Sequence, residues 1–485
     1  MRSSSMARKA GRSRFLPRSS ALAGIAAVGL VLAACSSGTS TSESSSAAAP
    51  ESSAAAPESS AAPAPTSEAP APAECTELNV QSGNGGSDAL LAGYEELNTA
   101  FEAANPGVTV NFEVKSFNEL VDTLPLQLSG DEVPDVTQVN QGYGSLGQLV
   151  TSGLVAPLDD VAEANDWAGR QGEALIALNG RFSPDGRDMG AGELYGVSAT
   201  GAWVGLFMNM EKAKELGISE PPKTLEEMEA MLAKAKEAGI TPLMFGATDG
   251  GEQIWLMANL LMGLTSPQTV TDVINGANEQ LPVESLKAAE IMKKWAEDGY
   301  LTDGWSALDS TEVLGLFSEG EGLFALNGSW NVFQSDKPEA FRLVPFPLAT
   351  ATDIGAIASG DLPWSVPANA KCPELAKEYI NFITSPEASE IWIKAGQVPA
   401  TISGNEQALV EANGLTGVSA DAILSWVNIM TNGTPIGFPD WATPTWYDTI
   451  SQSATALMAG EITPQEFVEA LQADYGAFTA ERTAS

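Results

Sequence analysis

The sequence predicts an α/β protein with more than one lobe, and two observations support this prediction. Strand-like and helix-like segments alternate along the chain. The strand-like segments have apolar residues at every second position, and the helix-like segments have them three or four positions apart. Such alternation is typical of a parallel sheet covered by helices. The chain has 485 residues, of which 44% are hydrophobic, so it is long enough for two or three lobes with separate cores.

The first 34 residues are typical of an export signal. Six basic residues within positions 2–18 precede an apolar run at 21–34, which is shorter than the about 20 residues that span a membrane. The tetrapeptide Leu-Ala-Ala-Cys ending at Cys35 resembles the lipobox of bacterial lipoproteins, although an ordinary signal peptide is the alternative. We therefore expect lipidation of Cys35 and anchoring at the outer face of the cytoplasmic membrane.

Residues 35–75 are expected to be the lipidated cysteine followed by a disordered linker. Ser, Ala, Pro, Thr and Glu make up nearly all of this segment, and AAAPESS occurs twice. Without large apolar residues the segment cannot bury a core.

Charge and composition exclude several functions. The chain carries 62 acidic against 24 basic residues, a net charge of −38, which makes nucleic acid and anionic lipid headgroups poor partners. Histidine is absent, so Ser-His-Asp and Cys-His catalysis and most zinc sites are excluded. We expect no enzyme activity, no metal and no cofactor. Cys75 and Cys372 are the other cysteines, and in an exported protein a disulfide is favoured over two free thiols.

The first part of the folded region contains three strands with ligand-type loops. Strands are expected at 76–81, 107–114 and 134–139. Helices follow from Leu90 and Phe117, and Pro125 should kink or end the second one.

Polar loops follow the first and third of these strands. The first leads into a Gly-rich loop at 82–88, but Asp88 stands where a dinucleotide-binding loop needs its third glycine. A ligand loop at a strand end is the better interpretation. The candidate ligand contacts are therefore Asn84 in this loop and Asn140 and Tyr143 after the third strand. The alternative is that these residues only form the turns.

The middle of the chain predicts more strands and helices in turn. Residues 193–209 form the longest strand-like run, with Trp203 in its middle. Thr224 and Glu227 form a capping box that begins a helix ending at Gly239. The remaining expectations are a strand at 240–245, an apolar helix beginning at Trp255, and a helix at 283–298.

The stretch at 319–334, EGEGLFALNGSWNVFQ, is the strongest candidate for a binding site. A buried strand at 323–326 ends in an Asn-Gly-Ser turn, and Trp330 follows at once. An indole just past a strand end, after two small residues, can offer a flat apolar face beside polar groups. A core tryptophan is the alternative.

The last third adds aromatic residues between predicted elements. We expect a strand at 341–346, a helix at 373–384, and a final helix that begins with the capping box Thr463–Glu466. Three further tryptophans lie here. Trp364 is in an apolar stretch at 353–367 that glycines interrupt, Trp441 ends a Phe-Pro-Asp-Trp group, and Trp446 begins a Trp-Tyr pair.

The order of these segments resembles the extracellular solute-binding proteins of ABC importers, in the large sugar-binding family that includes maltose-binding protein (family 1). The similarity is carried by residues 133–160, 193–239, 317–330 (FSEGEGLFALNGSW) and 372–400. It implies a two-lobed periplasmic-binding-protein fold, in which hinge segments join two α/β lobes and the ligand lies in the cleft between them. The implied boundaries are 76–202 and 357–430 for lobe I, and 203–356 and 431–485 for lobe II.

The resemblance also implies roles for particular residues. Trp330 takes the position of a tryptophan that commonly stacks on a sugar ring, and Trp446-Tyr447 resembles a Trp-Tyr pair whose tryptophan also stacks, although Trp441 is nearby. It places Cys75 and Cys372 in the same lobe. Sugars combine polar edges with apolar faces, so flat aromatics and amides suit them. The full set of expected ligand contacts is Trp330, Trp446, Trp441, Trp255, Trp203, Trp364, Asn84, Asn140 and Tyr143.

The sequence thus predicts a monomeric, lipid-anchored component of an ABC importer that captures a mono- or oligosaccharide and delivers it to the permease subunits. The same fold binding a polyamine is the first alternative, because the chain is acidic. A secreted glycoside hydrolase is the second, since paired carboxylates suffice for that chemistry, and only Asp361 and Asp440 lie where such a pair is expected.

Overall fold

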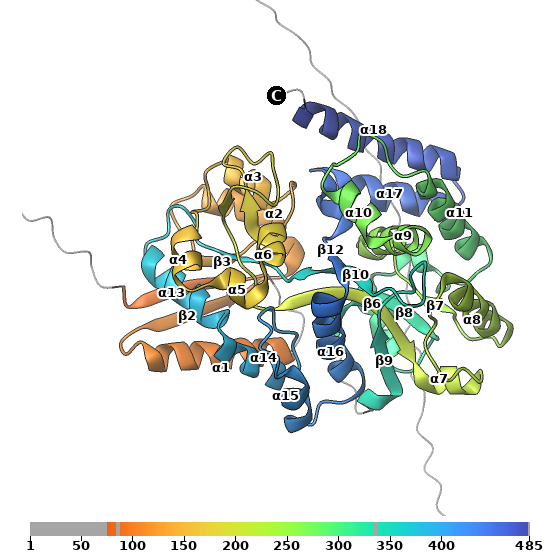
Figure 1. Cartoon of the computed structure of the whole chain (residues 1–485), viewed down its shortest axis with the longest axis horizontal. Coiled ribbons are helices and arrows are strands. Elements are labelled where there is room, and N and C mark those ends of the chain that lie inside the picture. Colours follow the sequence, from red (N-terminus) through yellow and green to blue (C-terminus); the bar gives the residue numbers. More distant parts are fainter. Residues whose placement is uncertain (1–74, 84–87, 333–336, 484–485) are drawn as a thin grey trace, which may run out of the picture. The chain divides into compact units, whose positions relative to one another are not determined.

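The computed structural model of the protein describes residues 75–83, 88–332 and 337–483. Cys35, the signal segment, the linker up to Glu74 and Asn84 lie outside the described residues. Two separate sheets organise the described chain (Figure 1). None of the helices that the structure describes has the length and apolar character needed to cross a bilayer.

Lobe I is built on a four-stranded sheet. Its strand order is β11 (Trp364–Ser365), β3 (Val136–Gln138), β1 (Glu77–Ser82) and β2 (Thr109–Val114). Strand β1 is parallel to β2 and β3, as expected, whereas β11 pairs antiparallel with β3. A two-stranded hairpin, β4 (Arg181–Phe182) and β5 (Glu193–Leu194), accompanies it. The helices of this lobe are α1 (Asp88–Ala104), α2 (Phe117–Leu128), α3 (Leu146–Thr151), α4 (Asp159–Ala164), α5 (Trp167–Gln171), α6 (Glu173–Gly180), α13 (Pro373–Ile383) and α14 (Pro386–Lys394).

Pro125 does not end α2, which continues to Leu128. The buried residues Leu120, Leu124 and Leu128 recur every four positions, so burial of this stripe keeps the last turn helical although the proline removes one hydrogen-bond donor.

Lobe II is built on a six-stranded mixed sheet. Its order is β12 (Thr434–Ile436), β10 (Gly355–Gly360), β6 (Gly201–Asn209), β8 (Phe324–Gly328) and β7 (Leu243–Met244), and β9 (Phe341–Val344) also pairs with β6. Strand β6 is buried along its whole length. Because side chains alternate between the faces of a strand, Val204, Leu206 and Met208 enter one core, and Trp203 and Phe207 enter another.

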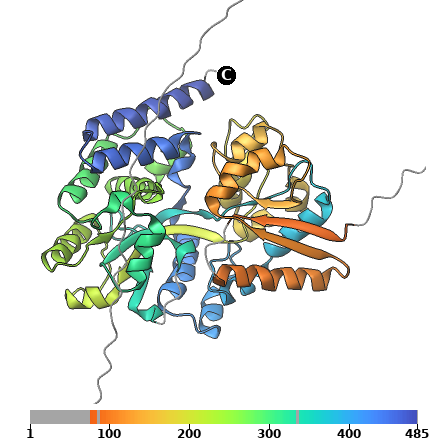
Figure 2. The same ribbon diagram turned by 180° about the vertical axis from the view of Figure 1, so that it is seen from behind.

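Helices cover both faces of this sheet. They are α7 (Met210–Glu215), α8 (Leu225–Glu237), α9 (Gly251–Leu264), α10 (Pro267–Ile274), α11 (Glu284–Glu297), α12 (Ser310–Ser318), α15 (Glu406–Ala412), α16 (Gly417–Asn432), α17 (Trp446–Met458) and α18 (Pro464–Thr483). Four short 3-10 helices are η1 (Trp305–Ala307), η2 (Ser329–Asn331), η3 (Pro338–Ala340) and η4 (Pro439–Ala442). Helices α17 and α18 lie side by side, which both views show (Figures 1 and 2).

Local signals predicted helix starts well. The Thr224 side chain accepts from the Glu227 amide, and in α18 Thr463 and Glu466 make both capping bonds. The prediction that an apolar helix begins at Trp255 is wrong, because α9 begins at Gly251. The N-cap Gly250 and the polar first turn, with Gly251, Glu252 and Gln253, obscure the periodic pattern there.

The run at 193–209 is not one strand. It divides into β5 and β6, and residues 197–200 between them pair instead with residues 361–364: Val197 and Trp364 exchange backbone hydrogen bonds, and the Asp361 amide donates to the Thr200 carbonyl. Residues 398–400 run beside these two segments, since the Gly201 amide donates to the Val398 carbonyl and the Ala400 amide donates to the Ala199 carbonyl. We propose that these three segments are the hinge between the two sheets.

Helix α16 packs on β9, β10 and β12 of the six-stranded sheet. We therefore propose lobe boundaries at the three hinge segments. These boundaries would place residues 355–360 and 401–430 in lobe II, whereas the resemblance implies lobe I for most of them.

Cys75 and Cys372 are joined by a disulfide, with their Cα atoms 5.8 Å apart. The bond ties the start of β1 to the N-cap of α13, and both elements belong to lobe I.

Candidate ligand-binding site

Four aromatic rings from three segments of lobe II meet in one cluster. The centroid of Trp330, in η2, lies 5.5 Å from that of Trp255 in α9, edge to face, and 5.8 Å from that of Phe438. Phe438 in turn lies 5.4 Å from Trp441, in η4. Three of the tryptophans expected to contact ligand are therefore neighbours in space although they are far apart in the sequence.

Glycine at position 328 allows this arrangement. A Cβ atom built there would lie 2.2 Å from the indole of Trp330, so the ring folds back over the end of β8 only because no side chain is present. Trp330, Trp255 and Phe438 each keep part of their surface exposed, whereas Trp441 is buried beneath them. The exposed indole faces are suited to stack on a flat apolar surface of a ligand.

A buried polar network supports the cluster from the sheet side. Asn327, the residue before Gly328, donates through Nδ2 to Glu252 (3.2 Å) and accepts through Oδ1 from Asn331 (2.9 Å). Glu252 also accepts from the Gly246 amide. Burial raises the pKa of Glu252 well above its ordinary value, and the negative charge of Asp249 adds to the effect. The network fixes the orientation of η2 and of the first turn of α9.

The loop after β3 brings lobe I against the same cluster. A Cβ atom at Gly142, whose φ is +80°, would lie 2.7 Å from the Trp441 ring, so this loop contacts η4 directly. Gln141 holds the loop in place by donating to the carbonyls of Gly360 (2.9 Å) and Asp361 (3.1 Å) at the hinge. Asn140 is partly exposed at the start of this loop.

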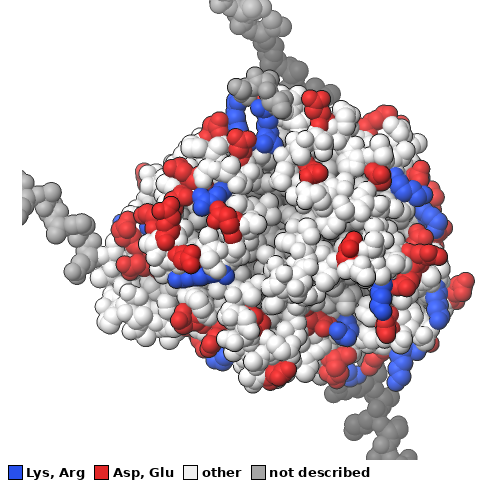
Figure 3. Space-filling model, viewed as in Figure 1, with Lys and Arg blue, Asp and Glu red and all other residues white. Residues whose placement is uncertain are grey.

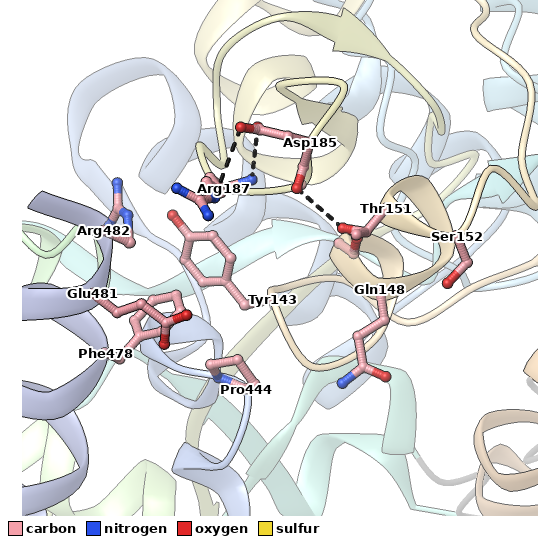
Figure 4. Close-up of a pocket in the computed structure, with 12 residues that line it drawn as sticks. Tyr143, Gln148, Thr151, Ser152, Asp185, Arg187, Pro444, Phe478, Glu481 and Arg482 are labelled. Atoms are coloured by element: carbon pink, nitrogen blue, oxygen red, sulfur yellow. Dashed lines mark hydrogen bonds and ion pairs between the residues drawn. The ribbon is translucent and has the colours of Figure 1, made fainter. Parts of the chain in front are cut away.

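Tyr143 lines a different hollow (Figure 4). Its ring lies 4.8 Å from Phe478 and 5.3 Å from the guanidinium of Arg482, both in α18. The hollow has a volume of about 390 Å³ and is also lined by Gln148, Thr151, Asp185 and Arg187, among others. None of the tryptophans lines it, so we place the ligand at the aromatic cluster, where stacking faces exist.

Three of the expected tryptophans lie in cores. Trp203 is fully buried, and its Nε1 donates to the Ala422 carbonyl at 2.9 Å. Trp364 is fully buried in lobe I against Tyr94, and Trp446 packs on Tyr475. We leave these three and Trp441, which is likewise buried, out of the proposed ligand contacts because buried indoles present no face to a ligand.

Three residues near the cluster are absent from the expected ligand contacts, although Asp440 is considered as a hydrolase carboxylate and Tyr447 belongs to the Trp-Tyr pair. They are Phe438, Asp440 and Tyr447, all close to the tryptophans of the last third. The dense Phe-Pro-Asp-Trp group was the available signal. What it could not reveal is which of its members face the cluster, because η4 has no regular period.

Charged side chains avoid the middle of the face shown in Figure 3. Acidic and basic residues are interspersed around its margin, and the central area is mostly uncharged.

The chain matches the sequence model of the bacterial extracellular solute-binding proteins over residues 85–390, and it belongs to this family. A Brucella abortus binding protein is 27% identical over 228 residues, 47% of this chain and 52% of that protein. The multiple sugar-binding protein of Streptococcus mutans is 25% identical over 226 residues, 44% of this chain and 52% of that protein. The chain thus spans about half the length of these curated relatives.

The solved structure of a chitin oligosaccharide binding protein is similar in fold, with a TM-score of 0.68 at 18% identity. The match covers 83% of this chain and 99% of that one. The expected two-lobed fold with hinge segments and a cleft between the lobes is confirmed.

Proposed function

We propose that the protein is the solute-binding component of an ABC importer and that its solute is a neutral mono- or oligosaccharide. The observation that carries the proposal is the pair of partly exposed indoles, Trp255 and Trp330, set at 75° to each other above a buried amide network. Two indole faces at a steep angle can cover two surfaces of a pyranose ring, while polar groups beside them pair with its hydroxyls.

Family membership and the names of similar proteins support the proposal. One relative is described as sugar-binding, and several proteins of similar fold are described with chitin oligosaccharide, raffinose or galactopyranose. Lobe closure over the ligand would present both lobes to the permease, and the lipid anchor at Cys35 would hold the complex at the outer face of the membrane.

The experiment is a binding panel on the full chain. Tryptophan fluorescence and calorimetry are recorded with galactose, maltose, xylobiose, chitobiose and raffinose, and with spermidine as the polyamine probe. We expect saturable binding of at least one sugar without release of reducing ends. Binding of spermidine alone would contradict the sugar proposal and favour the polyamine alternative, and release of reducing ends would favour the hydrolase.

A further inference from the structure

Each indole of the Trp255–Trp330 pair lies on a glycine. A Cβ atom built on Gly328 would lie 2.2 Å from the Trp330 ring, and one built on Gly251 would lie 3.0 Å from two ring atoms of Trp255. In α9 this follows from helix geometry, because a helical side chain points back over the preceding turn. The first turn of α9 and the end of β8 therefore form the backbone surfaces on which the two rings lie.

The residues next to these two glycines are hydrogen-bonded to each other. Glu252 follows the glycine in α9, and Asn327 precedes the glycine in β8. Nδ2 of Asn327 donates to Oε1 of Glu252 at 3.2 Å, and both residues are almost fully buried. A bond between buried polar groups is costly to break, because water cannot replace the lost partner. One side-chain bond thus joins the two backbone segments that support the indoles.

The other hydrogen bonds of this pair fix which atom donates and which accepts. Glu252 also accepts from the Gly246 amide. Oδ1 of Asn327 accepts from the Gly328 amide at 2.8 Å and from Nδ2 of Asn331 at 2.9 Å. Asn331 directly follows the tryptophan of η2, so the segment that carries this indole is held on both sides of the ring.

We propose that Glu252 and Asn327 are positioning residues, whose hydrogen bond sets the mutual orientation of the two indoles and thereby the affinity for sugar. The inference rests on the proposed function. The ring centroids are 5.5 Å apart and the ring planes are at 75°. A pair of rings held in this arrangement before the ligand arrives does not have to be ordered on binding, and the cost of ordering would otherwise reduce the affinity.

A reciprocal exchange of side chains tests the bond itself. Glu252→Gln places an amide NH₂ group opposite the donating NH₂ group of Asn327, so the bond is lost. Adding Asn327→Asp restores every bond with the roles reversed: the new amide donates to the new carboxylate and still accepts from Gly246, and the carboxylate still accepts from Asn331. The exchange keeps the size of both side chains and their combined charge.

Two measurements are made on the full chain. Far-ultraviolet circular dichroism without ligand records the exciton couplet of the indole pair, which depends on the angle between the rings and is assigned with Trp255→Phe and Trp330→Phe. Calorimetry uses galactose, maltose, xylobiose, chitobiose and raffinose. We expect Glu252→Gln to reduce the couplet at least twofold and to weaken binding at least tenfold. The double variant should recover both quantities to within twofold of the parent.

Asn209→Ala is the control for a general loss of stability. Asn209 is another buried asparagine, and it caps α7. Its amide donates to the Leu323 carbonyl, just before β8 begins, whereas the indole pair lies at the end of β8. This variant should have a lower melting temperature with an unchanged couplet and unchanged affinity. Asn327→Ala breaks the proposed bond without opposing two donors, and it replaces Glu252→Gln if that variant does not fold.

The outcomes separate the two proposals. A protein that binds none of the five sugars overturns the proposed function and the link to affinity, and the couplet still tests the orientation of the rings. A parental couplet in Glu252→Gln, a double variant without recovery, or parental affinity with an altered couplet overturns the inference alone.

Discussion

At the scale of single residues, Trp330 and Trp203 have opposite roles although both are tryptophans beside strands of one sheet. Trp330 is partly exposed above Gly328, and Trp203 is fully buried in the core between β6 and α16. Trp330→Ala should abolish tight sugar binding, a loss of at least tenfold or about 1.4 kcal/mol, with a small change in melting temperature. Trp203→Ala should instead cost about 3–5 kcal/mol of stability. Calorimetry and thermal melts on both variants test these expectations. A large loss of stability in Trp330→Ala, with sugar binding retained, would show that Trp330 is a core residue and not a ligand contact.

Asp440 also predicts a pH dependence of stability. Its folded pKa of about 6 lies above the ordinary 3.8, so the folded protein holds this proton more tightly than the unfolded chain does. The resulting stabilisation is complete below about pH 3.8 and is lost as the pH rises to 6. The shift corresponds to at most about 3 kcal/mol, and to less because the carboxylate is partly solvated.

The measurement is a set of unliganded melts from pH 4 to 7.5. Asp440→Asn should gain stability relative to the parent as the pH rises through this window, while Asp448→Asn follows the parent. A constant difference between Asp440→Asn and the parent would show that Asp440 has an ordinary pKa.

At the scale of elements, the sequence was informative where a local pattern decides the outcome. The caps at Thr224 and Thr463 and the strand before Trp330 could be predicted because each depends on neighbours in the chain. The burial of Trp203 could not, since it depends on α16, more than 200 residues away, covering one face of β6. The same limit applies to Asp440, whose position beside Tyr447 depends on how η4 and α17 pack.

Helix α18 contacts lobe I through Phe478 and Arg482, and the charged contact of Arg482 predicts an effect on lobe closure. Arg482 lies 5.3 Å from the Tyr143 ring centroid (Figure 4). It also lies 3.3 Å from a carboxylate oxygen of Asp188. Arg482→Ala should favour separated lobes and weaken sugar binding about three- to tenfold, since cation–π and ion-pair contacts of this kind contribute about 1 kcal/mol. Small-angle scattering and calorimetry test this.

Arg187→Ala is the matched control for Arg482. Arg187 lines the same hollow, and within the described ranges its one ion pair is with Asp185, 3.8 Å away in lobe I, so its loss should leave binding unchanged. Equal effects of the two substitutions would indicate a general charge effect instead of a contact between lobes.

The disulfide belongs to lobe I alone, and its loss should act on stability rather than on binding. It closes a separation of 297 residues, and removing it by Cys372→Ala should cost roughly 2–4 kcal/mol. Peptide mapping after alkylation of the unreduced, denatured protein should find Cys75 and Cys372 unmodified. Modification of both would contradict the bond.

At the scale of the whole molecule, anchoring and capture are separate tasks. The proposed lipid anchor at Cys35 lies in a segment of low complexity, whereas the aromatic cluster and hinge lie within residues 197–446. Cys35→Ser should release the protein from the membrane fraction, or leave it unprocessed, without changing its sugar affinity. A variant that still fractionates with membranes as the parent does would refute lipidation at this position.

The central claim is that a neutral sugar binds between the lobes on the Trp255–Trp330 platform. The most direct measurement is a crystal structure of the protein with the tightest-binding sugar of the panel. The account predicts a sugar ring stacked on the indole of Trp330 or Trp255. A sugar held in the hollow beside Tyr143 and Arg482, with both indoles uncovered, would contradict it.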